Sequence, residues 1–239
     1  MFAEVPHSPQ DVGFRLFGIP CRIHPFFWIA GAIFAWPHER DLPGSLMLGI
    51  VLSRMACLFV SILVHELGHA VLIRWAGFRP EIVLHGFGGY AMYQPTRSIR
   101  PAVLVAISFA GPAAGFLLYG LVCAIEPLLH LPVLPGQFGA IARDAVDQLK
   151  YINLFWGLIN LLPIYPLDGG QICRTLMHSR WGFGGLRNSL IISIIAAGGT
   201  AFYFYQTTGH EIFRLPVLLF GLLCVESIQA YQSLGYQRR

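Results

Sequence analysis

Charged residues are scarce in this chain, and lysine is almost absent. Asp, Glu, Lys and Arg make up only 12% of the 239 residues, and Lys150 is the single lysine. Soluble domains carry about 25% charged residues. Because 55% of the residues are hydrophobic, the composition predicts an integral membrane protein in contact with a lipid bilayer. The basic residues are scattered rather than clustered, which argues against nucleic acid as a partner.

The chain also lacks the usual cysteine patterns. Its five cysteines contain no Cys-x-x-Cys pair and lie mostly within apolar stretches. This pattern indicates neither a thiolate metal site nor a disulfide framework, and it predicts that the cysteines are small buried apolar side chains. The first residues lack a basic region followed by an apolar core, so we expect no cleaved signal peptide.

Apolar stretches that can form membrane helices recur six times. We expect an all-α polytopic membrane protein with about six transmembrane helices in a single domain, residues 1–239, and the longest polar loop at Leu131–Lys150. The first and fourth stretches are shorter than the ~20 residues of a full crossing, which is typical of broken helices. The six stretches are Pro25–Trp36, Leu46–Trp75, Ala102–Ile125, Leu149–Leu162, Ser189–Tyr205 and Leu215–Tyr231.

The basic residues are distributed unequally between the two sides that six crossings would create. Eleven of them fall on the side of the two termini, and four fall on the opposite side. Because basic loops tend to stay in the cytoplasm, the sequence predicts cytoplasmic termini. The second half of the stretch Leu46–Trp75 and the segment Pro163–Gly170 then lie toward the same cytoplasmic side.

The segment after the second helix differs from the rest because it combines short β-prone runs with glycines. Glu81–His85 and Tyr90–Tyr93 are predicted as two strands, which together form a short β-hairpin at the cytoplasmic interface. An exposed strand edge there could bind an extended peptide by strand addition, and a hairpin that only packs is the alternative. The candidate peptide contacts are Val83, Gly86 and Gly88.

One short motif places charge inside an apolar run. His65-Glu66-Leu67-Gly68-His69 lies within the predicted second helix, between the apolar runs 58–64 and 70–73. Residues four apart share one helix face, so the two imidazoles can hold one Zn²⁺, with Glu66 beside them as a possible general base. A carboxylate inside a membrane costs about 3 kcal/mol to insert, so such residues usually pair, bind or catalyse. The motif therefore predicts a metal site within the membrane.

A catalytic zinc site usually has three protein ligands and one position for water. The two histidines leave one ligand to find, and Asp168 is the best candidate. Two prolines before it stop the preceding helix, and two glycines after it let the chain turn, so a loop carries the carboxylate. Asp168 could instead cap a short helix from Gly170 to His178, and the two roles are compatible.

Taken together, these motifs resemble those of the site-2 protease family of intramembrane zinc metalloproteases. The motif His65-Glu66-Leu67-Gly68-His69 is followed later in the chain by Asn160, Pro163 and Pro166-Leu167-Asp168-Gly169-Gly170. Between them, Ser108-Phe109-Ala110-Gly111-Pro112 resembles a third family element. The resemblance implies a zinc metalloendopeptidase that hydrolyses a peptide bond in or near the transmembrane segment of a membrane protein substrate.

Two further segments resemble the compact branch of that family, which includes bacterial sporulation proteases and lacks PDZ and CBS modules. They are His24-Pro25-Phe26-Phe27-Trp28 and Phe87-Gly88-Gly89. The resemblance implies a catalytic core of about residues 23–178, with C-terminal helices at about 189–231. It also implies a bacterial inner membrane protein.

The family resemblance assigns a role to each polar residue of the motifs. In this family the two histidines and the aspartate bind one zinc ion, the glutamate activates water, and the asparagine helps to stabilise the oxyanion. The residues that match are His65, His69, Asp168, Glu66 and Asn160. Asn160 has an alternative role, in which its side chain only satisfies carbonyl groups of the loop beside it.

Two other functions compete with proteolysis. A metal-ion permease would use the same metal ligands for transport, but transporters commonly show internal repeats and have no need of Glu66. An inactive scaffold that binds membrane helices would have no need of the intact motif. Glu226 is the other acid within a predicted span, and an ion pair with Arg174 is one role that the sequence suggests. The sequence leaves the substrate and the oligomeric state open.

Overall fold

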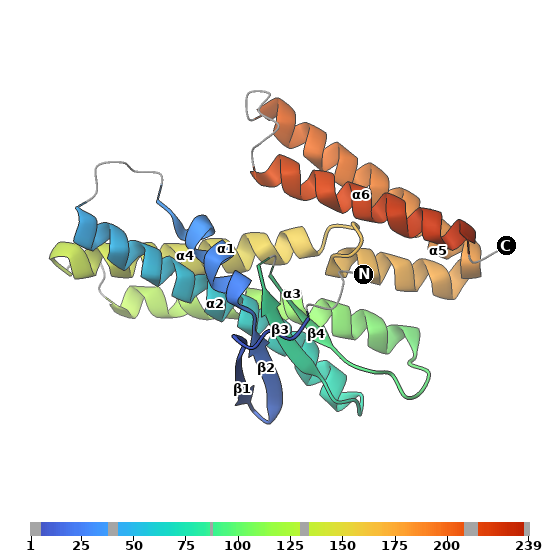
Figure 1. Ribbon diagram of the computed structural model, residues 1–239, viewed down its shortest axis with the longest axis horizontal. Coiled ribbons are helices and arrows are strands. Elements are labelled where there is room, and N and C mark those ends of the chain that lie inside the picture. The colour runs from blue at the N-terminus through green and yellow to red at the C-terminus, as the bar shows by residue number, and fades with distance from the viewer. Residues whose placement is uncertain (1–5, 38–42, 87, 130–133, 208–214, 237–239) are drawn as a thin grey trace. The chain divides into compact units, whose positions relative to one another are not determined.

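The computed structural model describes residues 6–37, 43–86, 88–129, 134–207 and 215–236 (Figure 1). These residues pack into two units. One unit takes its described residues from 2–98 and 110–157, and the other takes them from 99–109 and 158–239. A unit defined by packing need not be a functional domain. The single functional domain that the sequence predicts therefore stays a prediction.

Helices make up most of the described residues. Those long and apolar enough to cross a membrane, judged by length and composition, are α2, α3 with η1, α5 and α6, whereas α1 is apolar but short. The prediction of a helical polytopic membrane protein is confirmed, and the number of crossings stays a prediction. The helices are α1 (Pro25–Ala35), α2 (Gly44–Trp75), α3 (Pro101–Ile125), η1 (Glu126–Leu129), α4 (Gly136–Asn160), α5 (Asp168–Thr207) and α6 (Leu215–Tyr236).

Helix α4 corrects the prediction of a polar loop that extends to Lys150. The helix begins at Gly136, well before the predicted start at Leu149. Its charges are paired, which lets the helix extend through a polar sequence. Arg54 of α2 donates to Asp144 from Nη2 at 2.6 Å and from Nε at 3.0 Å. The ammonium group of Lys150 lies 2.8 Å from a carboxylate oxygen of Glu126.

A four-stranded sheet replaces the predicted hairpin. Its strands are β1 (Val12–Leu16), β2 (Ile19–Ile23), β3 (Glu81–His85) and β4 (Gly88–Met92), in the order β1-β2-β3-β4. The β3–β4 hairpin confirms the predicted pair, although β4 begins two residues before Tyr90. The β1–β2 hairpin was not predicted, and β2 pairs in parallel with β3, which lies far along the chain.

The first hairpin has a two-residue turn, Phe17-Gly18. Both residues have positive φ, at 51° and 78°. This conformation matches the twist of short hairpins, and it favours glycine at the second position. Arg74 of α2 holds the turn because its Nη1 donates to the Phe17 carbonyl at 2.6 Å. The turn signal is weak because phenylalanine rarely adopts positive φ.

One face of the sheet packs on the helices. The buried core consists of side chains from β2 and β3 together with α1 and α2. It places the start of β4 beside the second half of α2, where the His-Glu motif lies. The core residues are Ile19, Cys21, Ile23, Phe27, Ile62, Ala70, Ile82 and Leu84.

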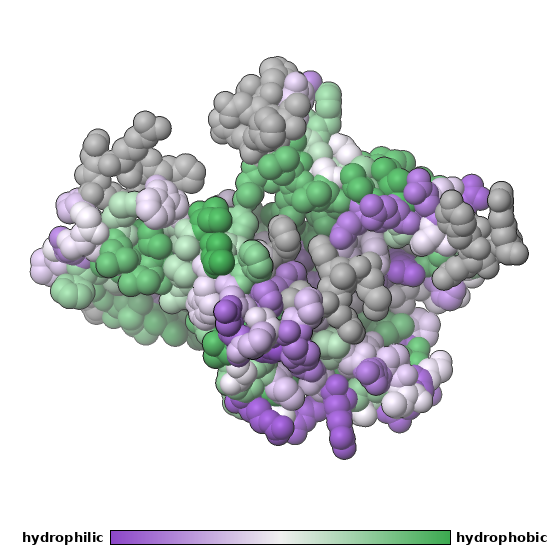
Figure 2. All heavy atoms as spheres, in the orientation of Figure 1, coloured by the Kyte–Doolittle hydropathy of each residue, from purple (hydrophilic) through white to green (hydrophobic). Residues whose placement is uncertain are grey.

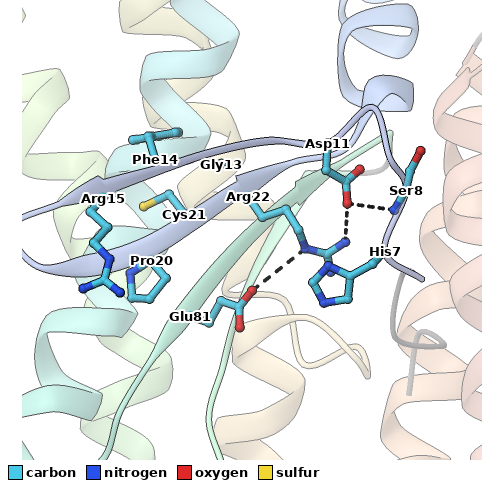
Figure 3. A pocket seen from close by; sticks show the side chains of 10 residues that line it. All are labelled: His7, Ser8, Asp11, Gly13, Phe14, Arg15, Pro20, Cys21, Arg22 and Glu81. Atoms are coloured by element: carbon cyan, nitrogen blue, oxygen red, sulfur yellow. Dashed lines mark hydrogen bonds and ion pairs between the residues drawn. The ribbon is translucent and has the colours of Figure 1, made fainter.

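An ion pair ties the N-terminal segment to the sheet (Figure 3). Arg22 of β2 donates to Asp11 Oδ2 at 2.8 Å, and its Nε lies 3.9 Å from Glu81 Oε1. The same Asp11 oxygen accepts the Ser8 amide at 3.0 Å. The bond from the Arg22 guanidinium holds the pKa of the Asp11 carboxyl below its usual range. These residues line a polar cavity of about 530 Å³.

The second unit is built mainly from α5 and α6. Helix α5 is two helical segments joined at Gly182, whose φ of 56° and ψ of −137° break the helix. A Cβ at Gly185 would overlap the Met177 carbonyl, so this turn is tightly packed. The buried core of the unit joins the loop after α4 to both helices through Ile164, Ala197, Phe220 and Leu223.

Candidate metal centre and active site

Helix α2 presents the two predicted histidine ligands on one face. Their Nε2 atoms, in His65 and His69, lie 3.2 Å apart, and both side chains are buried. Two nitrogens bound at about 2.05 Å to one tetrahedral zinc ion stand about 3.3 Å apart. The observed separation therefore fits one metal ion shared by the two imidazoles.

Small residues of α3 allow that helix to approach the histidines. A Cβ at Gly68 of α2 would overlap the Ala110 carbonyl of α3. A Cβ at Gly111 would overlap His69 Nε2 and would lie 2.7 Å from His65 Nε2. Gly111 therefore faces the ring nitrogens directly, and any larger residue would occupy space beside the ligand atoms. This contact explains why the segment Ser108–Pro112 has a glycine at position 111.

The candidate general base lies between the metal ligands and the sheet. Glu66 is 4% exposed, so its carboxylate is shielded from bulk solvent. A Cβ at Gly89 of β4 would lie 2.8 Å from Glu66 Cγ and 3.1 Å from Glu66 Oε1. The backbone of β4 thus passes against the Glu66 side chain, and only glycine fits at this point.

The sheet corrects one of the three predicted peptide contacts. Val83 pairs with Arg22 of β2 on one side and with Tyr90 of β4 on the other, and its side chain is fully buried. Both edges of β3 are therefore occupied, and Val83 cannot pair with a further strand. Within the described residues, the edge strand beside Glu66 is β4.

The other two predicted contacts lie at the turn that leads into β4. Gly88 begins β4 with a φ of 123°, a conformation that disfavours any residue with a Cβ. A Cβ there would also lie 3.3 Å from the Trp156 ring of α4. A Cβ at Gly86 would lie 3.3 Å from the Phe26 carbonyl of α1. Both glycines therefore have packing reasons of their own, and their part in peptide binding stays a prediction.

The remaining candidates, Asn160 and Asp168, belong to the second unit. Asn160 is the last residue of α4 and is 8% exposed. Asp168 is the first residue of α5, two residues before the predicted helix start at Gly170. A carboxylate in the first turn is stabilised by the backbone N–H groups there. The expectation that Asp168 lies at a helix N-terminus is therefore consistent with the structure.

Two buried serines hold the loop that precedes Asp168. Ser193 of α5 accepts the Tyr165 amide at 3.1 Å and donates to the Pro163 carbonyl at 3.2 Å. Ser227 of α6 donates to the Tyr165 carbonyl at 3.0 Å. Because these hydrogen bonds hold both the backbone N–H and the backbone carbonyl of Tyr165, the path of the chain into Asp168 is set by α5 and α6.

Sequence reasoning missed four residues that build this region. Gly89 and Gly111 are defined by what lies opposite them, and Ser193 and Ser227 bond to a loop distant in sequence. Both glycines lie in segments that the family resemblance singles out, but the contact that each one makes was not predicted. Serines within apolar helices are common, because a hydroxyl can bond to its own helix, so the two serines carry no distinguishing signal.

The sequence of the chain is similar to those of known metalloproteases. The model of the family described as Peptidase family M50 matches residues 136–204. A provisionally named zinc metalloprotease of Synechocystis sp., sll0528, is 31% identical over 194 residues, which cover 77% of this chain and 48% of that protein. Zinc metalloprotease MJ0392 of Methanocaldococcus jannaschii is 28% identical over 225 residues, covering 92% and 56%.

A solved structure shares the fold. The site-2 protease from Methanocaldococcus jannaschii superposes with a TM-score of 0.59 at 22% identity, covering 92% of this chain and 95% of that one. The fold of the chain is therefore that of a site-2 protease. The sequence similarity to curated zinc metalloproteases agrees with the resemblance of the sequence motifs. The chain spans about half the length of the curated zinc metalloproteases it matches.

Proposed function

We propose that this chain is an intramembrane zinc metalloprotease, which hydrolyses a peptide bond in or near the transmembrane segment of a membrane protein. The observation that carries the proposal is the His65–His69 pair, whose Nε2 atoms lie 3.2 Å apart with Glu66 buried beside them. This group lies in a helix that is apolar and long enough to cross a membrane. The names of the relatives as zinc metalloproteases support it.

One zinc ion is held by His65, His69 and Asp168. The first two are the histidines whose Nε2 atoms lie 3.2 Å apart on α2, and the third is the carboxylate at the start of α5. Two imidazoles and one carboxylate are a typical donor set for catalytic zinc, and they leave a position for water. No observation favours a metal-ion permease that would use the same residues.

The reaction divides its proton transfers and charge stabilisation between two residues. When bound, zinc supplies Lewis acidity that makes hydroxide available near neutral pH. Glu66 accepts a proton from the attacking water and passes it to the leaving amine as the C–N bond breaks. Asn160 donates its side-chain N–H to the oxygen that gains negative charge. An amide suits this role because it donates without adding charge.

The substrate is a membrane protein segment bound in extended form along β4. A helix cannot be cut while its amides are all bonded within it, so the segment must unwind near the metal. The outer edge of β4 offers backbone groups for strand addition, and Gly89 places that strand against Glu66. Gly86 and Gly88 keep the turn before β4 compact, and the buried Val83 supports it from β3.

The chain is a multi-pass membrane protein, and we propose a bacterial inner membrane with the active site toward the cytoplasm. The distribution of basic residues supports this orientation, because eleven lie on the side of the termini and four lie on the other.

The proposal is tested by reconstituting the protein in vesicles with tagged single-span proteins that carry helix-weakening residues in the span. Wild type is compared with Glu66→Gln, and zinc content is measured for both. We expect cleavage by wild type only, with equal zinc in the two proteins. Equal cleavage by the variant would remove Glu66 from the mechanism. Zinc flux into vesicles that persists in the variant would favour transport instead.

A further inference from the structure

A polar cavity of about 370 Å³ lies within the second unit, apart from the histidine pair. It is bounded by the first segment of α5, by the second half of α6 and by the loop at Tyr165. Its lining contains one base, Arg174, and one acid, Glu226. Gln229 and Ser233 add an amide and a hydroxyl. The metalloprotease mechanism uses none of these four side chains.

Glu226 has a buried carboxylate oxygen that receives no hydrogen bond from the described residues. Its Oε2 atom is shielded from solvent and has no hydrogen-bond partner. Leaving a buried carboxylate oxygen without a donor is costly, and the cost is recovered when a donor binds. Glu226, Gln229 and Ser233 are spaced three and four residues apart, so they form one stripe on α6.

Arg174 does not satisfy Glu226, which corrects the ion pair that the sequence suggested. The guanidinium carbon of Arg174 lies over the Tyr165 ring, 5.4 Å from its centre. The cavity therefore presents a positive and a negative group that are separate from each other. A ligand that matches this arrangement carries both charges, with N–H donors at its positive end.

The cavity lies at the level where the apolar part of α6 ends. Residues 215–225 contain no charged side chain, whereas the part from Glu226 onward is rich in Gln, Ser and Tyr. The first segment of α5, which forms the opposite wall, carries two arginines and a histidine. Hydrophilic residues gather around this end of α6 (Figure 2). This transition is typical of the headgroup region of a bilayer.

We propose that the cavity binds the headgroup of a phospholipid with a primary ammonium, such as phosphatidylethanolamine. Arg174 contacts the phosphate, and the Glu226 carboxylate accepts an N–H of the ammonium. Gln229 and Ser233 can accept the other two N–H groups, since an ammonium has three. Choline lipids have the same charges but no N–H donor, so the site discriminates against them. This inference does not depend on proteolytic activity.

The experiment uses the purified full chain in detergent and a series of lipids. All members of the series have the same net charge and the same acyl chains. Phosphatidylethanolamine, its N-methyl and N,N-dimethyl forms and phosphatidylcholine are titrated, and bound lipid is counted by native mass spectrometry. We expect wild-type affinity to fall stepwise along the series, by about tenfold or more in total, as expected for the loss of a charged hydrogen bond.

Variants assign the two contacts. Glu226→Gln is expected to reduce the ratio between the first and last lipids to less than about threefold. Arg174→Gln is expected to weaken all four lipids alike, because they share the phosphate. Arg180→Gln on α5 and Gln232→Ala on α6 are matched controls outside the cavity, and both should bind as wild type does.

Two outcomes of the lipid titrations overturn the proposal, and one outcome with a peptide does so as well. One is equal wild-type affinity across the methylation series, a measurement that needs no variant and so does not depend on how a variant folds. The other is a preference for the primary ammonium that persists in Glu226→Gln. A lysine-flanked transmembrane peptide that binds through Glu226, without any lipid preference, would assign the cavity to a peptide cation and also overturn it.

Discussion

Gly111 lies directly against the Nε2 atom of His65. A Cβ built at Gly111 would be 2.7 Å from that nitrogen. The close approach of α3 therefore keeps the metal-facing side of the histidine pair free of side-chain atoms. It also makes the metal site sensitive to a single added carbon.

Gly111→Ala is expected to lower zinc affinity by at least about tenfold while the chain still folds, because overpacking costs about 1–3 kcal/mol and here displaces the ring nitrogens. Gly120→Ala in the same helix is the matched control, since a Cβ there meets nothing within 4 Å. Zinc affinity is measured by competition with a chelator. Unchanged affinity in Gly111→Ala would show that α3 does not shape the metal site.

Gly89→Ala tests the contact between β4 and the candidate base. The added Cβ would lie 2.8 Å from Glu66 Cγ, so the carboxylate must move while the histidines stay in place. We expect kcat to fall by about 100-fold, as for a misplaced catalytic group, with zinc content unchanged. Gly13→Ala in β1 has open space around it and serves as control. Loss of zinc together with activity would mean that β4 supports the metal site rather than Glu66.

Ser227→Ala tests the clamp on the Asp168 loop. Loss of the hydroxyl leaves the Tyr165 carbonyl without this partner, so stability should fall by about 1–3 kcal/mol and zinc affinity should fall with it. Thr200→Val removes a hydroxyl that bonds only within its own helix, to the Ala196 carbonyl, and is the control. Unfolding in detergent and zinc competition are measured on both. Equal effects of the two substitutions would contradict a specific role for Ser227.

Asp11→Asn tests the ion pair at the N-terminal segment through its pH dependence. Because the Arg22 bond lowers the pKa of Asp11 in the folded chain, the ionised carboxylate stabilises the fold above its usual pKa of about 3.8. This stability is lost as the pH falls through the lowered pKa.

Thermal unfolding of wild type and Asp11→Asn should therefore differ at pH 7 and converge toward pH 3. Glu81→Gln changes the second acid beside Arg22, at the longer distance of 3.9 Å, and should have a smaller effect at pH 7. A difference between wild type and Asp11→Asn that is independent of pH would point to packing rather than charge.

The sheet shows where local sequence signals fail. The β3–β4 hairpin was predictable because its strands are joined by a short glycine-rich turn. Strand β2 pairs with β3 across some sixty intervening residues, and no local pattern encodes that partner. The start of α4 was misplaced for a related reason, since Arg54 of α2 neutralises Asp144 only in the folded chain.

The sequence by itself determined the membrane character, the long apolar helices and the shared face of His65 and His69. Each follows from composition or from the helix period, which act over a few residues. Only the tertiary structure decided that Gly111 backs the histidines, that Gly89 places β4 against Glu66, and that Ser193 and Ser227 hold the loop before Asp168. These are contacts between segments far apart in the chain, and they depend on how closely the backbones approach.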